Sequence, residues 1–153
     1  MSDPEDIRGW QRLDERITTS GRLKEDDVAP LKAIGVAQVI NLALDDHPEA
    51  LAGEAAKLVA AGIDYTHIPV PFDAPSNEHF AAFEAAMDAA EGPVHVHCIM
   101  NWRVAAFFYC RHLAQGMAEG EARALMRRQW DPAASDDPRA QVWAEFIARD
   151  VPA

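Results

Sequence analysis

Residues 94–103 read Val-His-Val-His-Cys-Ile-Met-Asn-Trp-Arg, and this stretch decides how the chain is interpreted. Its first four residues predict a short β-strand, which a tight loop joins to the start of a helix. Cys98 opens the loop and Arg103 closes it. In such a loop the backbone N–H groups point inward, the helix adds the positive end of its dipole, and the arginine offers a planar fork to two oxygens. The stretch therefore predicts an anion pocket around a sulfur nucleophile, in a field that favours the thiolate of Cys98.

Length and composition predict one ordinary globular domain. The 153 residues suit a single domain over 1–153, and 49% apolar with 25% charged residues is a typical composition. Lysine and arginine together number 14 against 25 acidic residues, which gives a net charge of −11. Such a surface repels nucleic acid and anionic lipid, so we expect no nucleic-acid or membrane partner and only a local affinity for phosphate.

The N-terminus and the cysteines predict a cytoplasmic protein. The first six residues are acidic, unlike the basic and then apolar start of a signal peptide, and no apolar run approaches the length of a membrane span. Two cysteines, Cys98 and Cys110, suggest reduced thiols and no disulfide framework. We expect Cys110 to be a packing residue of an apolar helix, with a resolving thiol as the alternative.

Apolar runs typical of strands alternate with amphipathic helical segments. Strands are expected over 17–21, 36–44, 63–68 and 94–97, and helices over 24–34, from Pro48 to Gly62, from Ser76 to Gly92, and over 104–113, 119–130 and 138–149. This order predicts an α/β fold with a mainly parallel sheet of four to five strands and helices on both faces. Ligands of such folds sit beyond the carboxyl ends of the strands, where the loops that begin at Asp45, Pro69 and Cys98 should converge.

Four segments of the chain carry a family resemblance. They are Ile-Thr-Thr-Ser-Gly at 17–21, Gly-Val-Ala-Gln-Val-Ile-Asn-Leu at 35–42, Ile-Pro-Val at 68–70, and His97-Cys98 with Arg103. Together they resemble the bacterial cysteine phosphatases, which are related to the tyrosine and dual-specificity phosphatases. The resemblance spans about residues 17–113 and leaves the C-terminal helices, over 119–150, outside it. It implies the phosphatase fold, a Cys98 nucleophile, an Arg103 clamp and a His97 that orients Cys98.

The loop departs from the family pattern in three respects. The family has five residues between cysteine and arginine, whereas residues 99–102 number four. Asn101 stands where a glycine is usual, and asparagine is the residue that best replaces glycine in a left-handed conformation. Val104 and Ala105 replace the usual hydroxyl after the arginine. A shorter loop has fewer inward amides, and the missing hydroxyl removes a hydrogen bond to the departing sulfur, so we expect slow turnover.

Asp73 is the predicted general acid. It lies in Val-Pro-Phe-Asp-Ala-Pro at 70–75, which is similar to the family's acid loop and is stiffened by its prolines. An ordinary turn aspartate is the alternative interpretation. Asp45 and Asp46 are substitutes on a neighbouring loop, although capping of the helix at Pro48 is the simpler role for them.

The remaining site residues lie in and before the loop. We expect Ile99, Met100, Asn101 and Trp102 to bind substrate together with Arg103; Trp102 either stacks on an aromatic substrate or covers the core. His95 and His97 alternate with valines and should point to one side of the strand. No third ligand follows at a recognisable spacing, so we expect no metal and no organic cofactor.

The predicted function is two-step hydrolysis of a phosphomonoester through a phosphocysteine, with a phosphorylated protein or small molecule as partner and phosphate or sulfate in the loop. A rhodanese-like sulfurtransferase is one alternative, because that family also has four residues in the loop. Its preferred arginine and glycine are, however, replaced by Ile99 and Asn101. The other alternative is a catalytically weak oxyanion-binding module. The substrate and the oligomeric state are not predicted by the sequence.

Overall fold

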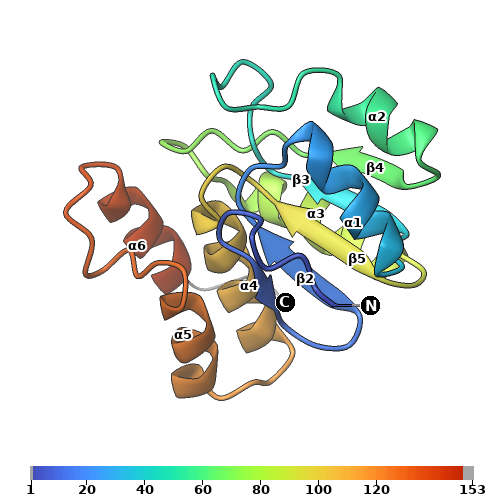
Figure 1. Cartoon of the computed structure of the whole chain (residues 1–153). Coiled ribbons are helices and arrows are strands. Elements are labelled where there is room, and N and C mark those ends of the chain that lie inside the picture. Colours follow the sequence, from blue (N-terminus) through green and yellow to red (C-terminus); the bar gives the residue numbers. More distant parts are fainter. Residues whose placement is uncertain (1, 150–153) are drawn as a thin grey trace.

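A five-stranded sheet forms the centre of the computed structural model, which describes residues 2–149 (Figure 1). Its strands are β1 (Gln11–Arg12), β2 (Ile17–Ser20), β3 (Gln38–Asn41), β4 (Asp64–His67) and β5 (Val94–His97). The strand order is β1-β2-β5-β3-β4; β1 is antiparallel to β2, and the other neighbours are parallel. The predicted mainly parallel sheet is therefore confirmed, and the strand that precedes Cys98 lies at its centre.

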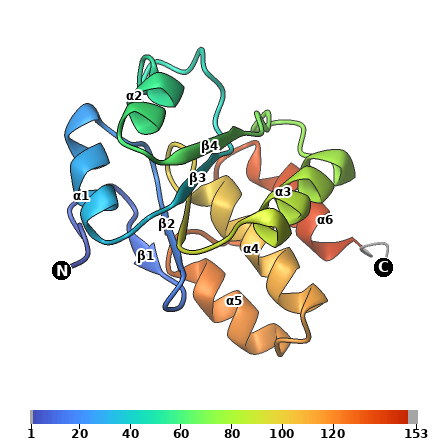
Figure 2. The same ribbon diagram turned by 90° about the vertical axis from the view of Figure 1, so that its right-hand side faces the viewer.

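Helices cover both faces of the sheet, as predicted (Figure 2). They are the short 3-10 helix η1 (Glu25–Asp27), α1 (Val28–Ala33), α2 (Glu54–Ala60), α3 (Asn77–Ala89), α4 (Trp102–Ala114), α5 (Glu119–Arg127) and α6 (Ala140–Ala148). In Figure 2, α1 and α2 lie on one side of the sheet, and α3, α4, α5 and α6 lie on the other. No helix within residues 2–149 is both long and apolar enough to cross a membrane.

Two apolar clusters hold these layers together. Val39 packs with Leu31 and Leu58 under α1 and α2, whereas the next residue, Ile40, belongs to the larger cluster that contains Phe83. Successive residues of a strand point to opposite faces, so a strand that is covered on both sides needs a continuous apolar run. This explains why residues 36–44 show no alternation of polar and apolar residues.

The boundaries of several elements differ from the prediction. The helix that we expected to begin at Pro48 begins at Glu54, after Gly53 in a left-handed conformation, so the predicted capping role of Asp45 and Asp46 is wrong. Turns occupy most of the segment between β3 and α2, which makes this loop longer than predicted. The cap of α3 is confirmed, because Ser76 Oγ accepts a hydrogen bond from the His79 backbone N–H at 3.2 Å. Of the predicted domain and its C-terminal helical region, Met1 and residues 150–153 lie outside the described residues.

Candidate active site

The loop from β5 to α4 turns on Asn101. This residue has a φ of 69°, and it is the one non-glycine residue with a positive φ in the described part of the chain. Its side-chain Nδ2 donates hydrogen bonds to Gly9 O at 2.8 Å and to Thr19 Oγ1 at 3.0 Å. The left-handed conformation expected for Asn101 is thus confirmed, and its side-chain amide adds two hydrogen bonds that a glycine could not make.

The end of β2 holds the other side of the loop. The backbone N–H of Arg22 donates to Ile99 O at 2.8 Å. A Cβ atom built on Gly21 would lie only 2.4 Å from the same Ile99 oxygen. The strand and the loop therefore approach so closely that residue 21 has no room for a side chain.

A cavity of about 320 Å³ opens above this loop. It is lined by six of the residues that the sequence predicts for the site, namely Asp73, Cys98, Ile99, Met100, Trp102 and Arg103. The three loops expected to converge do so here, since Leu44 and Asp46 of one, Phe72 and Asp73 of the second and Cys98 of the third face the same space. Cys98 is only 1% exposed, whereas Asp73 is exposed.

Arg103 is buried in the first turn of α4 and bridges two of these loops. Its Nη1 donates a hydrogen bond to Val70 O at 2.9 Å, and its Cζ lies 5.7 Å from the centre of the Phe72 ring. A guanidinium has five N–H donors, and this bond uses one of them. The contact fixes the direction of a cation that lines the same cavity as Cys98.

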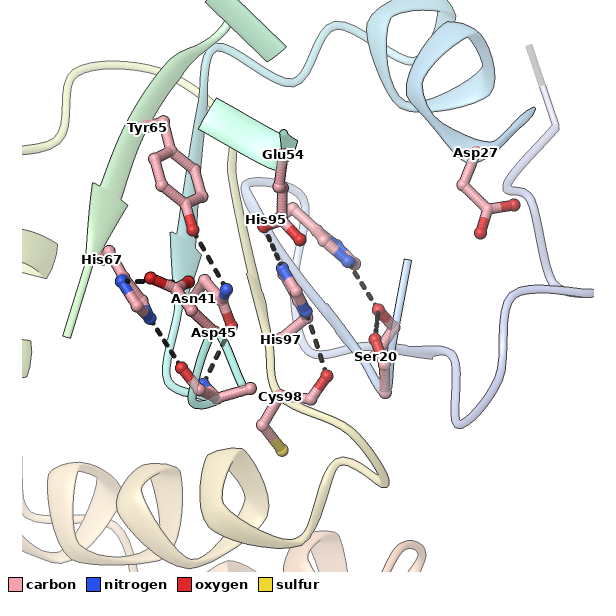
Figure 3. Close-up of polar contacts among 12 residues, drawn as sticks. Ser20, Asp27, Asn41, Asp45, Glu54, Tyr65, His67, His95, His97 and Cys98 are labelled. Carbon is pink, nitrogen blue, oxygen red and sulfur yellow. Dashed lines mark hydrogen bonds and ion pairs between the residues drawn. The ribbon is translucent and has the colours of Figure 1, made fainter. Parts of the chain in front are cut away.

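His97 connects the backbone of Cys98 to a carboxylate on α2 (Figure 3). Its Nδ1 lies 3.0 Å from Cys98 O, and its Nε2 lies 2.7 Å from Glu54 Oε2. A carbonyl oxygen only accepts, so Nδ1 carries a proton and donates it to Cys98 O. One further proton lies between Nε2 and Oε2. Both side chains are buried, and together they hold the backbone at Cys98 in place.

A second polar cluster lies on the other side of Glu54. Asn41 Nδ2 donates to the Tyr65 hydroxyl at 3.0 Å, and His67 Nε2 donates to Ala43 O at 2.6 Å. Burial, helped by the charges of Glu54 and Asp45, raises the pKa of Tyr65 to about 12, so this hydroxyl stays neutral at ordinary pH. Asp45 lines this neighbouring cavity, whereas Asp46 lines the one that contains Cys98.

His95 has a purely internal set of partners (Figure 3). Its Nδ1 lies 2.8 Å from Thr18 Oγ1, and its Nε2 lies 2.8 Å from Ser20 Oγ, which itself donates to Gly21 O. Ser20 Oγ must therefore accept from Nε2–H, and Nδ1 accepts from Thr18. Complete burial lowers the pKa of His95 well below its ordinary value, so the ring is neutral.

The two strand histidines do lie on one side of β5, as expected, with ring centres 6.3 Å apart. Between residues 2 and 149, no group of three or more His, Cys, Asp or Glu side chains gathers in a way that could hold a metal ion. Cys110 is a free, buried cysteine inside α4, and burial raises the pKa of its thiol. This is the environment of a packing residue.

The structure separates one predicted substrate residue from the cavity and adds others. The Asn101 side chain lies inside the protein, against Gly9 and Thr19. Trp102 lines the cavity and stacks on Trp130, with ring centres 4.8 Å apart. The sequence did not predict Glu54 beneath the loop or Leu44, His47, Phe72 and Arg139 around the cavity.

The signals for these missed residues differ. Phe72 is the neighbour of the predicted acid and could have been included with it. Glu54 has only its place in the first turn of an amphipathic helix, which many surface glutamates share. Arg139 lies in the segment that the family resemblance does not cover, and only the fold brings it to the cavity.

Sequence comparisons place most of the chain in one family. Residues 9–115 match the family model of the phosphatase-like domain of beta-lactamase hydrolase-like proteins. A beta-lactamase hydrolase-like protein of Agrobacterium fabrum is 36% identical over 90 residues, which are 57% of this chain and 21% of that protein. One of Xylella fastidiosa 9a5c is 28% identical over 144 residues, or 92% and 32% of the two chains. The chain thus spans only a fifth to a third of the length of these curated relatives.

Solved structures agree with this assignment. A candidate phosphatase from Shewanella putrefaciens CN-32 has a TM-score of 0.80 and 31% identity, over 95% of each chain. TpbA of P. aeruginosa, in a complex with phosphotyrosine, has a TM-score of 0.71 over 93% of this chain and 85% of its own; at 23% identity it shows the shared fold alone. The resemblance to bacterial cysteine phosphatases is confirmed, and the chain belongs to the family of the phosphatase-like domain of beta-lactamase hydrolase-like proteins.

Proposed function

We propose that the protein is a cysteine-dependent phosphatase that hydrolyses a phosphomonoester through a phosphocysteine on Cys98. The observation that carries this proposal is one cavity of about 320 Å³ lined by Cys98, Arg103 and Asp73. These residues supply a nucleophile, a cation for the phosphoryl oxygens and a proton donor. The family assignment supports phosphatase chemistry of this class.

In the first step, Cys98 Sγ attacks the phosphorus in line with the ester oxygen. The sulfur–phosphorus bond forms as the phosphorus–oxygen bond breaks, and Asp73 donates its proton to the departing alcohol or phenol. Arg103 and the backbone N–H groups of the loop hold the other phosphoryl oxygens while their charge redistributes. The bond from Arg103 to Val70 O keeps this cation aimed at the cavity.

In the second step, the Asp73 carboxylate accepts a proton from the attacking water. Water oxygen bonds to phosphorus, the phosphorus–sulfur bond breaks, and phosphate leaves with Cys98 again a thiolate. Val104 and Ala105 follow Arg103, so no hydroxyl from these positions stabilises the departing sulfur. Breakdown of the phosphocysteine is therefore the slow step that we propose.

Aryl phosphates are the first substrates to test. Phe72 and Trp102 both line the cavity, with ring centres 6.0 Å apart, and together form an aromatic wall beside Cys98. TpbA, which shares the fold, binds phosphotyrosine in its solved complex. Either a phosphorylated protein or a small molecule can present such a group, and inorganic phosphate or sulfate should occupy the loop as product or mimic.

The test compares wild-type protein with Cys98→Ser. With p-nitrophenyl phosphate, wild type should release phosphate, and acid quenching followed by mass spectrometry should show one added phosphoryl group on Cys98. Cys98→Ser should show neither. Equal hydrolysis by the two proteins overturns the proposal.

Two other results would assign a different function. Tight phosphate binding without turnover of aryl, peptide or inositol phosphates would indicate an oxyanion-binding module. Sulfur transfer from thiosulfate to cyanide, with a persulfide on Cys98, would indicate a sulfurtransferase; the four-residue loop is the observation in favour of that activity.

A further inference from the structure

We infer that the C-terminal helix α6 belongs to the catalytic apparatus, and that Trp143 on this helix is a positioning residue that holds the Asp73 loop in its working place. The inference rests on the proposed function, because it takes Asp73 as the proton donor. It assigns a role to a segment that lies outside residues 9–115, the part matched by the family.

A hydrogen bond joins α6 to the residue directly before the proton donor. Trp143 Nε1 donates to Phe72 O at 2.6 Å, and the Trp143 side chain is fully buried. The carbonyl group of Phe72 lies in the same planar peptide unit as the backbone nitrogen of Asp73. A hydrogen bond that holds the Phe72 oxygen therefore also holds the peptide plane that contains the backbone nitrogen of Asp73.

Aromatic packing holds the same point from several directions. The centre of the Phe72 ring lies 6.0 Å from that of Trp102, 5.7 Å from Trp130 and 5.8 Å from Trp143. Arg139, next to the start of α6, places its Cζ 4.4 Å from the centre of this ring. Phe72 thus contacts both the Trp143 indole of α6 and the guanidinium of Arg139, which precedes α6 and lines the cavity.

The loop before Asp73 is tied at two carbonyl groups by two different helices. Arg103 of α4 binds Val70 O, and Trp143 of α6 binds Phe72 O. Between them stands Pro71, whose ring restricts the backbone. The acid loop is therefore anchored before substrate arrives, and Asp73 meets the leaving group from a fixed position.

This role predicts an effect that depends on the leaving group. Phenolate is a strong base and needs a proton as it departs, whereas 2,4-dinitrophenolate is a weak base and leaves without one. A misplaced general acid therefore slows hydrolysis of phenyl phosphate and spares 2,4-dinitrophenyl phosphate. A displacement of about 1 Å is enough for a loss of about 100-fold. Loss of stability alone would slow both reactions equally.

The experiment compares Trp143→Phe with the matched control Trp130→Phe. Trp130 packs against the same Phe72 ring, but its indole N–H has no hydrogen-bond partner in the part of the chain that the structure describes. Both variants lose one ring, and only the first loses a bond to the acid loop. Trp143→Phe should lower kcat/KM for phenyl phosphate by about 10- to 100-fold and for 2,4-dinitrophenyl phosphate by less than about 3-fold. Trp130→Phe should change both by the same factor.

If Trp143→Phe does not fold, benzothienylalanine at position 143 replaces it, because this analogue keeps the bicyclic shape and lacks the N–H. Equal losses on both substrates, or no loss, overturn the inference. An Asp73→Asn variant that slows hydrolysis of both substrates by the same factor also overturns the inference. In that case, hydrolysis that depends on Cys98 would still support the phosphocysteine. Wild-type hydrolysis that does not need Cys98 would instead remove the proposed function itself, so the two failures are distinguishable.

Discussion

Glu54 Oε2 and His97 Nε2 lie 2.7 Å apart in the interior, and the other ring nitrogen of His97 donates to the carbonyl of Cys98. These two hydrogen bonds link the first turn of α2 to the backbone of Cys98. Removing one member of a buried, hydrogen-bonded pair leaves the other without a partner, and the loss is larger than for a surface pair. The pair therefore contributes to the stability of the loop as well as to its geometry.

Replacement of Glu54 should reveal both contributions. We expect Glu54→Ala to lower the free energy of unfolding by about 1–3 kcal/mol, because it leaves the buried Nε2 of His97 without a hydrogen-bond partner. Glu54→Gln retains a hydrogen-bonding group at this position and should lose less. Both variants should lower kcat more than they raise KM, since they act on the placement of Cys98. Urea denaturation and steady-state kinetics with an aryl phosphate measure these effects.

The control for this experiment is Glu49→Gln. Glu49 pairs with Arg8 and Arg22 at the surface, where its side chain is 38% exposed. Its loss should change the free energy of unfolding far less than the loss of Glu54, because water screens an exposed ion pair. Equal effects at Glu54 and Glu49 would contradict the role assigned to the buried pair.

Gly21 gives a second prediction. Its Cβ would meet a backbone oxygen, Ile99 O, at 2.4 Å, so Gly21→Ala must displace the loop. We expect the free energy of unfolding to fall by about 1–3 kcal/mol and phosphate affinity, measured by calorimetry, to fall with it. Gly120→Ala in α5 is the matched control, because a Cβ there meets nothing within 4 Å and a helical glycine costs stability. Unchanged phosphate binding in Gly21→Ala would contradict the close contact between strand and loop.

The central sheet could be predicted because local patterns determine it. Val94 to His97 forms β5 with the predicted bounds, and the apolar run around Val39 and Ile40 identifies a strand buried on both faces. The start of α2 could not be predicted, because Asp45 and Asp46 before Pro48 have the local signals of a helix cap although the chain remains in turns up to Gly53.

The residues of the site also divide into those that the sequence could predict and those that it could not. Cys98, Arg103 and Asp73 follow strand ends, so the topology of a parallel sheet places them together. Glu54 and Trp143 reach the site through contacts between elements far apart in the chain, at 2.7 and 2.6 Å respectively. Neither contact leaves a mark on local spacing, because a glutamate in a first helical turn and a tryptophan on an apolar face are both common in helices that have no functional role.

Asn101 has two structural roles, a left-handed backbone conformation and two side-chain hydrogen bonds, which substitutions can separate. Asn101→Gly keeps the left-handed backbone and loses the bonds to Gly9 O and Thr19 Oγ1, whereas Asn101→Ala loses both the bonds and the conformational preference. The left-handed region costs a residue with a Cβ about 1–2 kcal/mol, so the alanine variant should be the less stable of the two by about this amount. Thermal and urea unfolding measure the order, and an alanine variant as stable as the glycine variant would contradict it.

The fully buried, neutral His95 makes stability depend on pH. Burial lowers the pKa of His95 well below its ordinary value of 6.5 in the folded protein, so below pH 6.5 the unfolded chain binds a proton that the folded chain excludes. The stability that the neutral His95 ring contributes should therefore be fully present above pH 6.5. Below it, the free energy should fall by up to about 1.4 kcal/mol per pH unit, until the folded pKa is reached.

His112 adds to this slope, because burial and the charge of Arg111 lower its pKa as well. The His112 ring is only about half buried, so its contribution to the pH dependence of stability should be smaller than that of His95. Urea denaturation between pH 7.5 and 5 measures the total, and His112→Gln should reduce the slope while leaving most of it. A proton NMR titration should show His95 remaining neutral through this range. Stability that stays constant from pH 7 to pH 5 would mean that burial does not keep the folded His95 ring unprotonated.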